Sequence, residues 1–434
     1  MKHGLFGGMH FPQLGNAAFS KPIEPLPPPP QVVLAMPLSG GVPCRPSVKA
    51  GDYVTVGQEI AAAEGLPAVH TPISGRVSAV APRVQPSGTS VLSVVVDNDF
   101  SDTLCPAVRP PADPGGLPAR QILALLRRSG ITERTTPLVP IHQKIAAGMG
   151  RVDTVIINAC ESEPGMAANN RLALEHPESL LGGAGVLAKL YGVDHVHIAL
   201  EREKREAIHI LRSKIQELKA PAVVDALSIR YPQSAGKPLC HALTGRRVPP
   251  GATVSAIGCA VIDAPAAAAL YEAVYHGRPL THRVITVSGS GIRESRNLLC
   301  PVGTPIRYLL DACGGVDANT FKILLGGPMT GQAQYDMDAP VDGSAAVLAF
   351  CAGEERTSAH PHCIRCGRCI DVCPVGLRPA VLYRYEQAGR LDKLKQARLA
   401  DCIECGACTY VCPGRAPLLQ SFRSAKQRLG KEEA

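Results

Sequence analysis

Tryptophan is absent from the 434-residue sequence, and aromatic residues of all kinds make up only 4% of it. Apolar residues nevertheless account for 45% of the chain, so small aliphatic side chains must do most of the packing. A single hydrophobic core stops growing at about 250–300 residues, and longer chains divide into domains. We therefore expect a multidomain protein with a sizeable buried interior.

Long apolar segments are also missing. No run reaches the roughly 18 consecutive apolar residues that a transmembrane helix needs. The first 25 residues contain no apolar core of the kind that marks a secretory signal peptide. We expect a cytoplasmic protein without a transmembrane segment of its own, which becomes peripheral on the cytoplasmic face of the membrane only through partners.

Lysine and arginine form no continuous run of the kind found in nucleic-acid-binding arms. The formal net charge of +8 is modest for a chain of this length. We predict no nucleic-acid partner, and we interpret the charge as favouring solubility and attraction to an acidic carrier protein or an anionic membrane surface.

Cysteine is the residue type with the clearest pattern. Half of the 16 cysteines lie in two repeats, "CIRCGRCIDVCP" at 363–374 and "CIECGACTYVCP" at 402–413, displaced by 39 residues. The spacing C-x2-C-x2-C-x3-C-P is typical of [4Fe–4S] proteins, and in two-cluster ferredoxins the fourth cysteine of each motif ligates the other cluster. This rule assigns one cluster to Cys363, Cys366, Cys369 and Cys412, and the other to Cys402, Cys405, Cys408 and Cys373.

A pair of zinc sites is the alternative interpretation of these repeats. Zinc motifs usually combine C-x2-C pairs from separate knuckles, whereas each repeat here has three closely spaced cysteines and a C-P ending. We therefore predict two [4Fe–4S] clusters. Two neighbouring clusters pass single electrons and cannot accept a hydride, so we expect a separate redox donor. The eight scattered cysteines are interpreted as small buried side chains in a reducing compartment.

Composition and periodicity divide the chain into segments. Residues 1–30 contain the proline run "PLPPPP" and are predicted to form a stiff N-terminal strap that adds no core element. Residues 31–112 alternate short strands and turns, and resemble the two halves of a lipoyl- or biotinyl-type barrel-sandwich hybrid. Because "AAAEGLPAV" (61–69) lacks the modifiable lysine of such domains, we expect a docking module.

Helices and strands alternate in the next segment. Residues 113–278 predict βαβ units around a mainly parallel sheet, and residues 279–350 predict a smaller α+β unit. The cysteine repeats and the helix between them occupy 355–422, and 423–434 are predicted as a tail. "GGAGVL" (182–187) falls inside a predicted helix, so we interpret it as helix packing and not as a phosphate loop.

Several stretches outside the cysteine repeats stand in a distinctive order: "FGGMHFP" (6–12), "VKAGDYVTVGQEI" (48–60), "VIINACESEP" (155–164), "ALTGRRVP" (242–249) and "LLGGPMTG" (324–331). Together with the repeats they resemble the C subunit (RnfC) of the Rnf/Rsx ion-translocating ferredoxin:NAD oxidoreductase over nearly the whole chain. The resemblance implies a multidomain α/β protein: a barrel-sandwich hybrid, an α/β domain like the flavin- and NADH-binding subunit of complex I, an SLBB-like β-grasp unit and a helical dicluster ferredoxin domain.

The same resemblance implies a function. The chain would be an electron-transfer subunit that relays electrons through its two clusters between a ferredoxin- or NADH-side donor and a partner complex containing membrane-bound Rnf-type subunits. Lys144, Glu161 and Glu163 fall on positions of the family's flavin and NADH pocket. No catalytic residue is assigned, because no nucleophile–base pair is recognisable by spacing.

The stretch "GITERTTPLVPIHQKI" (130–145) departs from the family's glycine-rich flavin loop. Glycines are replaced, a glutamate that repels phosphate is introduced, and a proline removes a backbone donor. The residues concerned are Glu133, Thr135, Thr136, Pro137 and Leu138, while Pro140, His142 and Lys144 match the family.

Two further regions, which contact the flavin in the family, also differ from the family pattern in a way that disfavours FMN. Asn169 stands where the family has Asp, and Asp263, Ala264 and Ala266 stand where it has N-V-x-T. We therefore expect FMN binding in the usual mode to be lost and the pocket to be vestigial. This leaves two alternatives: a soluble RnfC-like carrier that feeds a reductase, such as those associated with proline reductase, or a flavin-less module that binds a partner.

Overall fold

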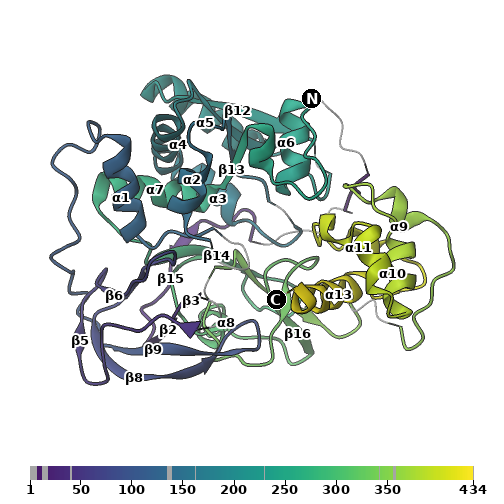
Figure 1. Ribbon diagram of the computed structural model, residues 1–434. Coiled ribbons are helices and arrows are strands. Elements are labelled where there is room, and N and C mark those ends of the chain that lie inside the picture. Colours follow the sequence, from purple (N-terminus) through teal and green to yellow (C-terminus); the bar gives the residue numbers. More distant parts are fainter. Residues whose placement is uncertain are drawn as a thin grey trace.

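The computed structural model describes residues 7–11, 18–39, 42–133, 139–161, 163–228, 230–341, 343–354 and 358–433. Within these residues the chain is a mixed α/β protein, with one six-stranded and two four-stranded sheets and a helical C-terminal part. Figure 1 shows the C-terminal helices in yellow at one side, next to the two mixed or parallel sheets. The prediction of a multidomain α/β architecture is confirmed.

Residues 31–98 form an antiparallel β-unit. Its main sheet has the order β2 (Gln31–Ala35), β9 (Ser90–Asn98), β8 (Gly75–Val84), β5 (Tyr53–Val54). Two small hairpins accompany it: β3 (Leu38–Ser39) with β4 (Val42–Pro43), and β6 (Glu59–Ala61) with β7 (Val69–His70). Alternate side chains face one buried core, as the two-residue period of a strand requires: Val32, Leu34, Val77, Val94 and Val96.

The α/β part is built on a parallel sheet. Its order is β12 (Ala222–Leu227), β11 (Val196–Glu201), β10 (Thr154–Asn158), β13 (Cys259–Asp263), and every pairing is parallel. The predicted parallel sheet is therefore confirmed. The chain leaves β10 toward β11 on one side and returns as β13 on the other, so the strand order reverses between β10 and β13, where ligands of such sheets usually bind.

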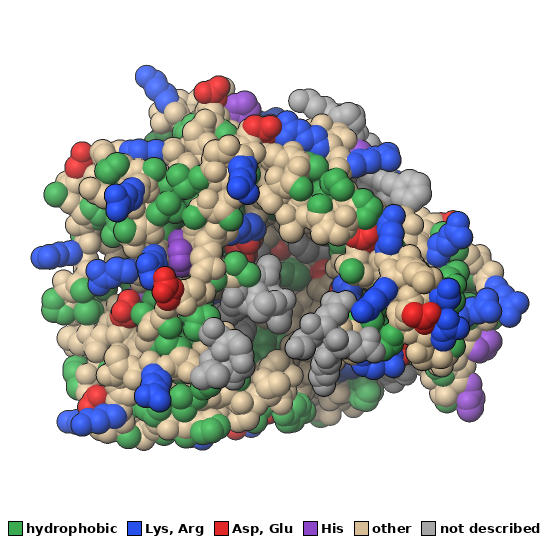
Figure 2. Space-filling model, in the orientation of Figure 1, with side chains coloured by type: hydrophobic (Ala, Val, Ile, Leu, Met, Phe, Trp, Pro, Cys, Tyr) green, Lys and Arg blue, Asp and Glu red, His purple; other side chains and the backbone are tan. Residues whose placement is uncertain are grey.

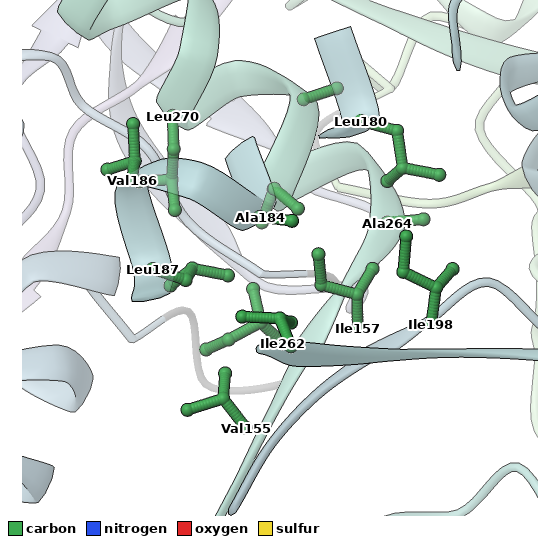
Figure 3. Close-up of a cluster of buried hydrophobic side chains, with 14 of the residues drawn as sticks. Val155, Ile157, Leu180, Ala184, Val186, Leu187, Ile198, Ile262, Ala264 and Leu270 are labelled. Atoms are coloured by element: carbon green, nitrogen blue, oxygen red, sulfur yellow. The ribbon is translucent and has the colours of Figure 1, made fainter. Parts of the chain in front are cut away.

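Helices cover this sheet: α1 (Ala119–Arg128), α2 (Ile141–Gly148), α3 (Ala168–Glu175), α4 (Pro177–Tyr191), α5 (Arg205–Leu218), α6 (Gly236–Thr244), the 3-10 turn Val254–Ile257 and α7 (Ala264–His276). Figure 3 shows strand residues Val155, Ile157, Ile198 and Ile262 near Leu180, Ala184 and Leu187 of α4 and Leu270 of α7. All of these side chains are almost completely buried.

A six-stranded mixed sheet forms the third unit. Its order is β1 (Ile23–Pro25), β15 (Arg296–Pro301), β14 (His282–Ser288), β18 (Ala346–Cys351), β16 (Thr320–Leu325), β17 (Gln332–Ala333), and α8 (Ile306–Ala312) packs against it. The expectation that the N-terminal strap adds no core element was wrong, since Ile23–Pro25 joins this sheet and Leu26 lies in its buried cluster. This stretch pairs in parallel with β15, because its backbone lies along an otherwise open sheet edge.

The C-terminal part repeats one helical pattern. It contains α9 (Arg368–Asp371), α10 (Pro379–Gln387), α11 (Leu391–Gln396), a 3-10 turn at Leu399–Asp401, α12 (Ala407–Tyr410) and α13 (Leu418–Glu433). The first residues of α12 and α13 lie 39 positions after those of α9 and α10. Helix α13 continues through residues 423–433, the stretch predicted as a tail, because its apolar face packs Phe422 and Ala425 into the same core as Leu382 and Leu394.

None of the helices that the structure describes combines the length and the apolar character needed to span a bilayer.

Glycines allow α4 and α7 to approach closely. A Cβ atom on Gly183 would lie 2.0 Å from the carbonyl oxygen of Ala267, and one on Gly182 would lie 2.1 Å from the ring of Tyr271. The interpretation of "GGAGVL" as a helix-packing stretch is thus confirmed.

Two alanine substitutions in α4 test this packing. Gly183→Ala should lower the free energy of unfolding by about 1–3 kcal/mol, because the new methyl group overlaps the backbone of α7. Gly185→Ala is the matched control, since its Cβ would meet nothing within 4 Å and should be neutral or stabilising by about 1 kcal/mol. Urea unfolding followed by circular dichroism compares them, and equal midpoints for the two variants would contradict the close approach.

Candidate functional site

The two cysteine repeats have the same backbone conformation. Arg365 and Glu404, which occupy equivalent positions, both have a positive φ, of 57° and 54°. Gly367 and Gly406 follow with φ values of 79° and 72°. Residues other than glycine rarely adopt this left-handed region, so its recurrence at the same 39-residue step means that both repeats fold as one type of loop.

Each repeat also directs a backbone donor at its fourth sulfur. The N–H of Leu377 donates to Sγ of Cys373 at 3.3 Å, and the N–H of Ala416 donates to Sγ of Cys412 at 3.4 Å. Hydrogen bonds to sulfur ligands stabilise the thiolate and are one of the means by which a protein sets the potential of an iron–sulfur cluster.

One cavity gathers cysteines from both repeats. Cys373, the fourth cysteine of the first repeat, lines it together with three cysteines of the second: Cys402, Cys405 and Cys408. The other walls are largely apolar and include Leu377, Leu419 and Phe422.

The remaining cysteines of the first repeat differ in their exposure to solvent. Cys366 is exposed, and Cys363 is half-buried. Cys369 is buried, and burial raises the pKa of its thiol; the charges of Cys363 and Cys412 act in the same direction. Cys412 therefore lies near cysteines of the first repeat, although it belongs to the second.

The cysteines of this cavity can ionise to thiolates only beside a positively charged partner. Burial raises the pKa of Cys405 to about 11, and the nearby Cys402 and Cys373 raise it further because thiolates repel one another. Iron supplies the compensating charge, and thiolates are the ligands of iron–sulfur clusters, so these residues fit such a group.

Among the described residues, no three His, Cys, Asp or Glu side chains surround a point where a single metal ion could sit. A cubane cluster is larger than one ion, and its thiolates stand correspondingly farther apart.

The N-terminal segment 7–11 contacts both the α/β part and the second repeat. Met9 and Tyr231 exchange two backbone hydrogen bonds of 2.8 Å, and the Tyr231 hydroxyl donates to the carbonyl oxygen of Cys405. The Phe11 ring packs on Tyr231 and on Tyr410, with ring centroids 5.1 and 5.6 Å apart. Sequence reasoning missed these residues, since they come from three distant parts of the chain.

Glycine in "FGGMHFP" has a physical reason. Gly7 has a φ of +67°, and a Cβ there would lie 2.6 Å from the carbonyl oxygen of Cys373. The next residue, Gly8, donates its N–H to Val372 at 2.9 Å. The segment therefore lies directly against the end of the first repeat.

Glu163 connects the α/β part to the loop 326–331. Its carboxylate accepts hydrogen bonds from the N–H of Met329, and from the N–H and hydroxyl of Thr330. Burial raises the pKa of Glu163, and the hydrogen bonds from Thr330 and Met329 oppose that shift. A Cβ on Gly327 would lie 2.2 Å from this carboxylate, which explains the second glycine of "LLGGPMTG".

The loop 326–331 in turn touches the second repeat. A Cβ on Gly406 would lie 2.8 Å from the carbonyl oxygen of Met329, and Arg423 donates to the carbonyl oxygen of Thr330 at 3.2 Å. Arg423 also pairs with Glu404 at 3.1 Å. Glu163, predicted as a flavin- or NADH-pocket residue, thus lies at a junction between three parts of the chain.

Glu161 and Asn169 lie close to the end of β10. Glu161 accepts a hydrogen bond from the N–H of Asn170 at 2.8 Å. The side-chain amide of Asn169 donates to the carbonyl oxygen of Cys160 at 2.7 Å. An ionised aspartate could not donate this bond, which gives a physical reason for asparagine at position 169.

Carboxylates occupy the point where the strand order reverses. Glu133 is 5% exposed, pairs with Lys144, and accepts the N–H of Asp263 at 3.1 Å. Lys144 also donates to the carbonyl oxygen of Val261. Asp263 caps α7 by accepting the N–H of Ala266 at 2.9 Å. Lys144 and the N–H of Ala266 at the start of α7 are therefore already bound to groups of the chain itself.

This arrangement does not fit a flavin phosphate. An anion here would meet the carboxylates of Glu133 and Asp263, and the cation of Lys144 is already paired. Burial raises the pKa of Glu133, and the charge of Asp263 adds to this while Lys144 opposes it. The other replaced loop positions, Thr135, Thr136, Pro137 and Leu138, lie outside the described residues.

The contact between Glu163 and the loop 326–331 can be tested by Glu163→Gln. Glutamine replaces one accepting oxygen by an NH2 group, so the free energy of unfolding should fall by about 1–3 kcal/mol. The amides of Met329 and Thr330 should exchange with solvent faster, as measured by hydrogen–deuterium exchange. Glu294→Gln is the control, because that exposed ion pair contributes little. Unchanged hydrogen–deuterium exchange of Met329 and Thr330 in Glu163→Gln would contradict the contact between Glu163 and the loop 326–331.

Three family models match the chain. The RnfC barrel-sandwich hybrid domain matches residues 3–101, the Nuo51 FMN-binding domain matches 126–272, and the 4Fe-4S dicluster domain matches 356–416. The predicted iron–sulfur domain is thus confirmed, and the zinc alternative is not supported. The middle match concerns a domain named for FMN, although the carboxylates of Glu133 and Asp263 at the strand reversal disfavour a phosphate there.

A crystal structure of an NAD+-reducing [NiFe]-hydrogenase in the H2-reduced state is similar in fold. The TM-score is 0.52 at 14% identity, over 71% of this chain and 62% of the hydrogenase chain.

Relatives from three bacteria resemble the chain over most of its length. The C subunit of the Na(+)-translocating ferredoxin:NAD(+) oxidoreductase complex of Acetobacterium woodii is 35% identical over 99% of this chain and 98% of its own. The equivalent protein of the proton-translocating complex of Clostridium ljungdahlii is 32% identical over 87% and 83%. That of the ion-translocating oxidoreductase complex of Rhodobacter capsulatus is 36% identical over 99% and 83%. With these identities across nearly its whole length, the chain belongs to the RnfC family of ion-translocating oxidoreductase complexes.

Proposed function

We propose that this chain is the iron–sulfur electron-transfer subunit of an Rnf-type ferredoxin:NAD oxidoreductase complex. The observation that carries the proposal is the cavity in which Cys373 lies with Cys402, Cys405 and Cys408. Membership of the RnfC family and the match to a dicluster domain support it. When bound, two [4Fe–4S] clusters supply two one-electron redox centres at adjacent positions.

We assign the cluster ligands by the crossing pattern. One set is Cys363, Cys366, Cys369 and Cys412, and the other is Cys402, Cys405, Cys408 and Cys373. The backbone donors of Leu377 and Ala416 stabilise the two thiolates that cross between the repeats. Lys426 donates to the carbonyl oxygen of Cys402 at 2.7 Å and pairs with Glu404, which places positive charge beside the enclosed set.

The two ends of this relay face different surroundings. The second repeat contacts Tyr231 of the α/β part and the loop 326–331, whereas Cys366 of the first repeat is exposed. Electrons therefore enter or leave at the exposed end in exchange with a protein partner. We assign hydride chemistry with NADH to a partner or to another part of the complex, since Glu133 and Asp263 oppose a flavin phosphate in this chain.

The names of the relatives support a location at the membrane. They describe subunits of ion-translocating complexes, so we place this chain as a peripheral subunit on the cytoplasmic face, held by membrane-bound partners. The observation at Glu133 also favours a second candidate, a flavin-less soluble carrier that feeds a separate reductase. Co-purification with membrane-spanning subunits from the native host separates the two.

Paired cysteine substitutions test the crossing of the ligands. Wild-type protein should hold about eight iron atoms per chain, and Cys373→Ser should hold about four. Adding Cys405→Ser to Cys373→Ser should cost no further iron, because both belong to one set. Adding Cys366→Ser instead should remove the rest. Iron analysis and electron paramagnetic resonance measure this, with Cys351→Ser as control. The opposite pattern in the two double variants would show that each repeat ligates its own cluster.

The flavin content of the purified protein tests the proposal that the strand reversal no longer binds FMN. Protein purified anaerobically with both clusters loaded should release well below one FMN per chain on denaturation, because the lysine and the helix donor are already bound to carboxylates. NADH alone should leave the visible absorbance of the clusters unchanged, while dithionite should bleach it. About one FMN per chain, or bleaching by NADH, would restore flavin chemistry to this chain.

A further inference from the structure

The two repeats differ sharply in how their cysteine loops are covered. In the first repeat Ile364 is 54% exposed and Ile370 is 38% exposed, on either side of the exposed Cys366. Their counterparts in the second repeat, Ile403 and Thr409, are half-buried. Apolar side chains are thus presented to solvent at one end of the relay, beside a proposed cluster ligand.

Positive charge is concentrated in the same part of the chain. Residues 355–434 contain 14 Lys and Arg against 8 Asp and Glu, a net +6 of the chain's +8 in less than a fifth of its length. Figure 2 shows Lys and Arg side chains gathered over the region of α9 to α11.

Four of the eight acidic residues there form ion pairs within the domain. Glu404 pairs with Arg423 and Lys426, Glu386 with Arg428, Asp392 with Arg390, and Asp401 with Arg398. These four therefore do little to offset the positive field of the remaining arginines toward solvent, and Asp371 at the end of α9 is the exposed acidic residue next to Ile370.

Two of those arginines flank the exposed cysteine. Arg365 and Arg368 are both exposed, and neither takes part in an ion pair with any residue that the structure describes. We call the surface made by Ile364, Arg365, Cys366, Arg368 and Ile370 the basic face. It combines arginine with apolar side chains, which is the composition of protein interfaces.

We propose that the basic face docks a small acidic protein that carries one electron at a time. The inference rests on the proposed function and names the partner that binds at the exposed end of the relay. Complementary charge would steer the acidic carrier to the face, and Ile364 and Ile370 would be covered on contact. Docking here brings the redox centre of the carrier beside Cys366, where an electron passes in either direction without any bond being made or broken.

The geometry favours a carrier over an anionic lipid surface. Helices that bind membranes lie in the interface with a long apolar face, whereas α9 has only four residues. A lipid surface would also cover an exposed end of the relay without exchanging electrons with it.

Charge reversal at two positions tests the proposal. A reduced acidic two-cluster ferredoxin is mixed with oxidised full-length holoprotein. Bleaching of the clusters of the holoprotein is followed by stopped flow at several salt concentrations. Arg365→Glu with Arg368→Glu should lower the second-order rate constant at least about tenfold at low salt and flatten its salt dependence. The control is Arg205→Glu with Arg212→Glu on α5, which makes the same charge change on exposed positions and should stay within about twofold of wild type.

Reduced methyl viologen separates the proposal from the function on which it rests. If this small cation reduces the clusters of wild type and both variants, the relay is intact. An unchanged ferredoxin rate in the Arg365/Arg368 variant then overturns docking at the basic face. If methyl viologen reduces no cluster even in wild type, it is the electron-transfer function that fails. Arg365→Gln with Arg368→Gln removes the charge without reversing it, and replaces the first variant if that one loses iron.

Phosphatidylglycerol vesicles test the alternative occupant. Loss of vesicle binding in the Arg365/Arg368 variant, together with an unchanged ferredoxin rate, would assign the basic face to the membrane and overturn the proposal. Loss of the ferredoxin rate with no change in vesicle binding supports it.

Discussion

The mutual repulsion of buried thiolates is the constraint on which the C-terminal part depends. Four cysteines share one largely apolar cavity, and one of them, Cys373, comes from the other repeat. Such a group is stable only with a compensating cation, so folding of this part and uptake of iron are coupled. Cys373 connects the two repeats through this cavity. The helices α10 and α13 connect them a second time, since they pack on one shared core that includes Leu382 and Phe422. With the ligands assigned as we propose, neither repeat can complete its site alone.

The contacts around the second repeat explain why distant glycine-containing stretches belong to one functional unit. Gly7 lies against the end of the first repeat, Gly327 leaves space for the carboxylate of Glu163, and Gly406 lies against the loop that Glu163 holds. A side chain at any of these positions would overlap its neighbour. The result is a continuous set of contacts from the end of β10 to the cysteine cavity. In the same region Glu133 satisfies Lys144 and the start of α7 from within the chain. The polar groups at the strand reversal therefore bind other groups of this chain.

Local patterns predicted those elements whose formation depends on local sequence. Helical spacing predicted the helix that contains "GGAGVL", which is α4, and the alternation of helices with apolar strands predicted the parallel sheet. The strand Ile23–Pro25 was not predicted, because a proline-rich stretch has no strand pattern of its own and pairs only where an edge is available. The partner of Glu163 was not predictable either, since 166 residues separate it from Met329.

What the sequence by itself determined is the chemistry of the cysteine repeats and the family, because ligand type and spacing are written in consecutive residues. The departure at Glu133 could likewise be read from the sequence as a charge unfavourable to phosphate. Only the tertiary structure decided where that charge goes: it binds Lys144 and the N–H of Asp263. The tertiary structure also decided which repeat faces solvent, because two loops with the same cysteine spacing and backbone conformation have different parts of the chain packed against them. Cys366 is left exposed, while Cys405 lies beneath Tyr231.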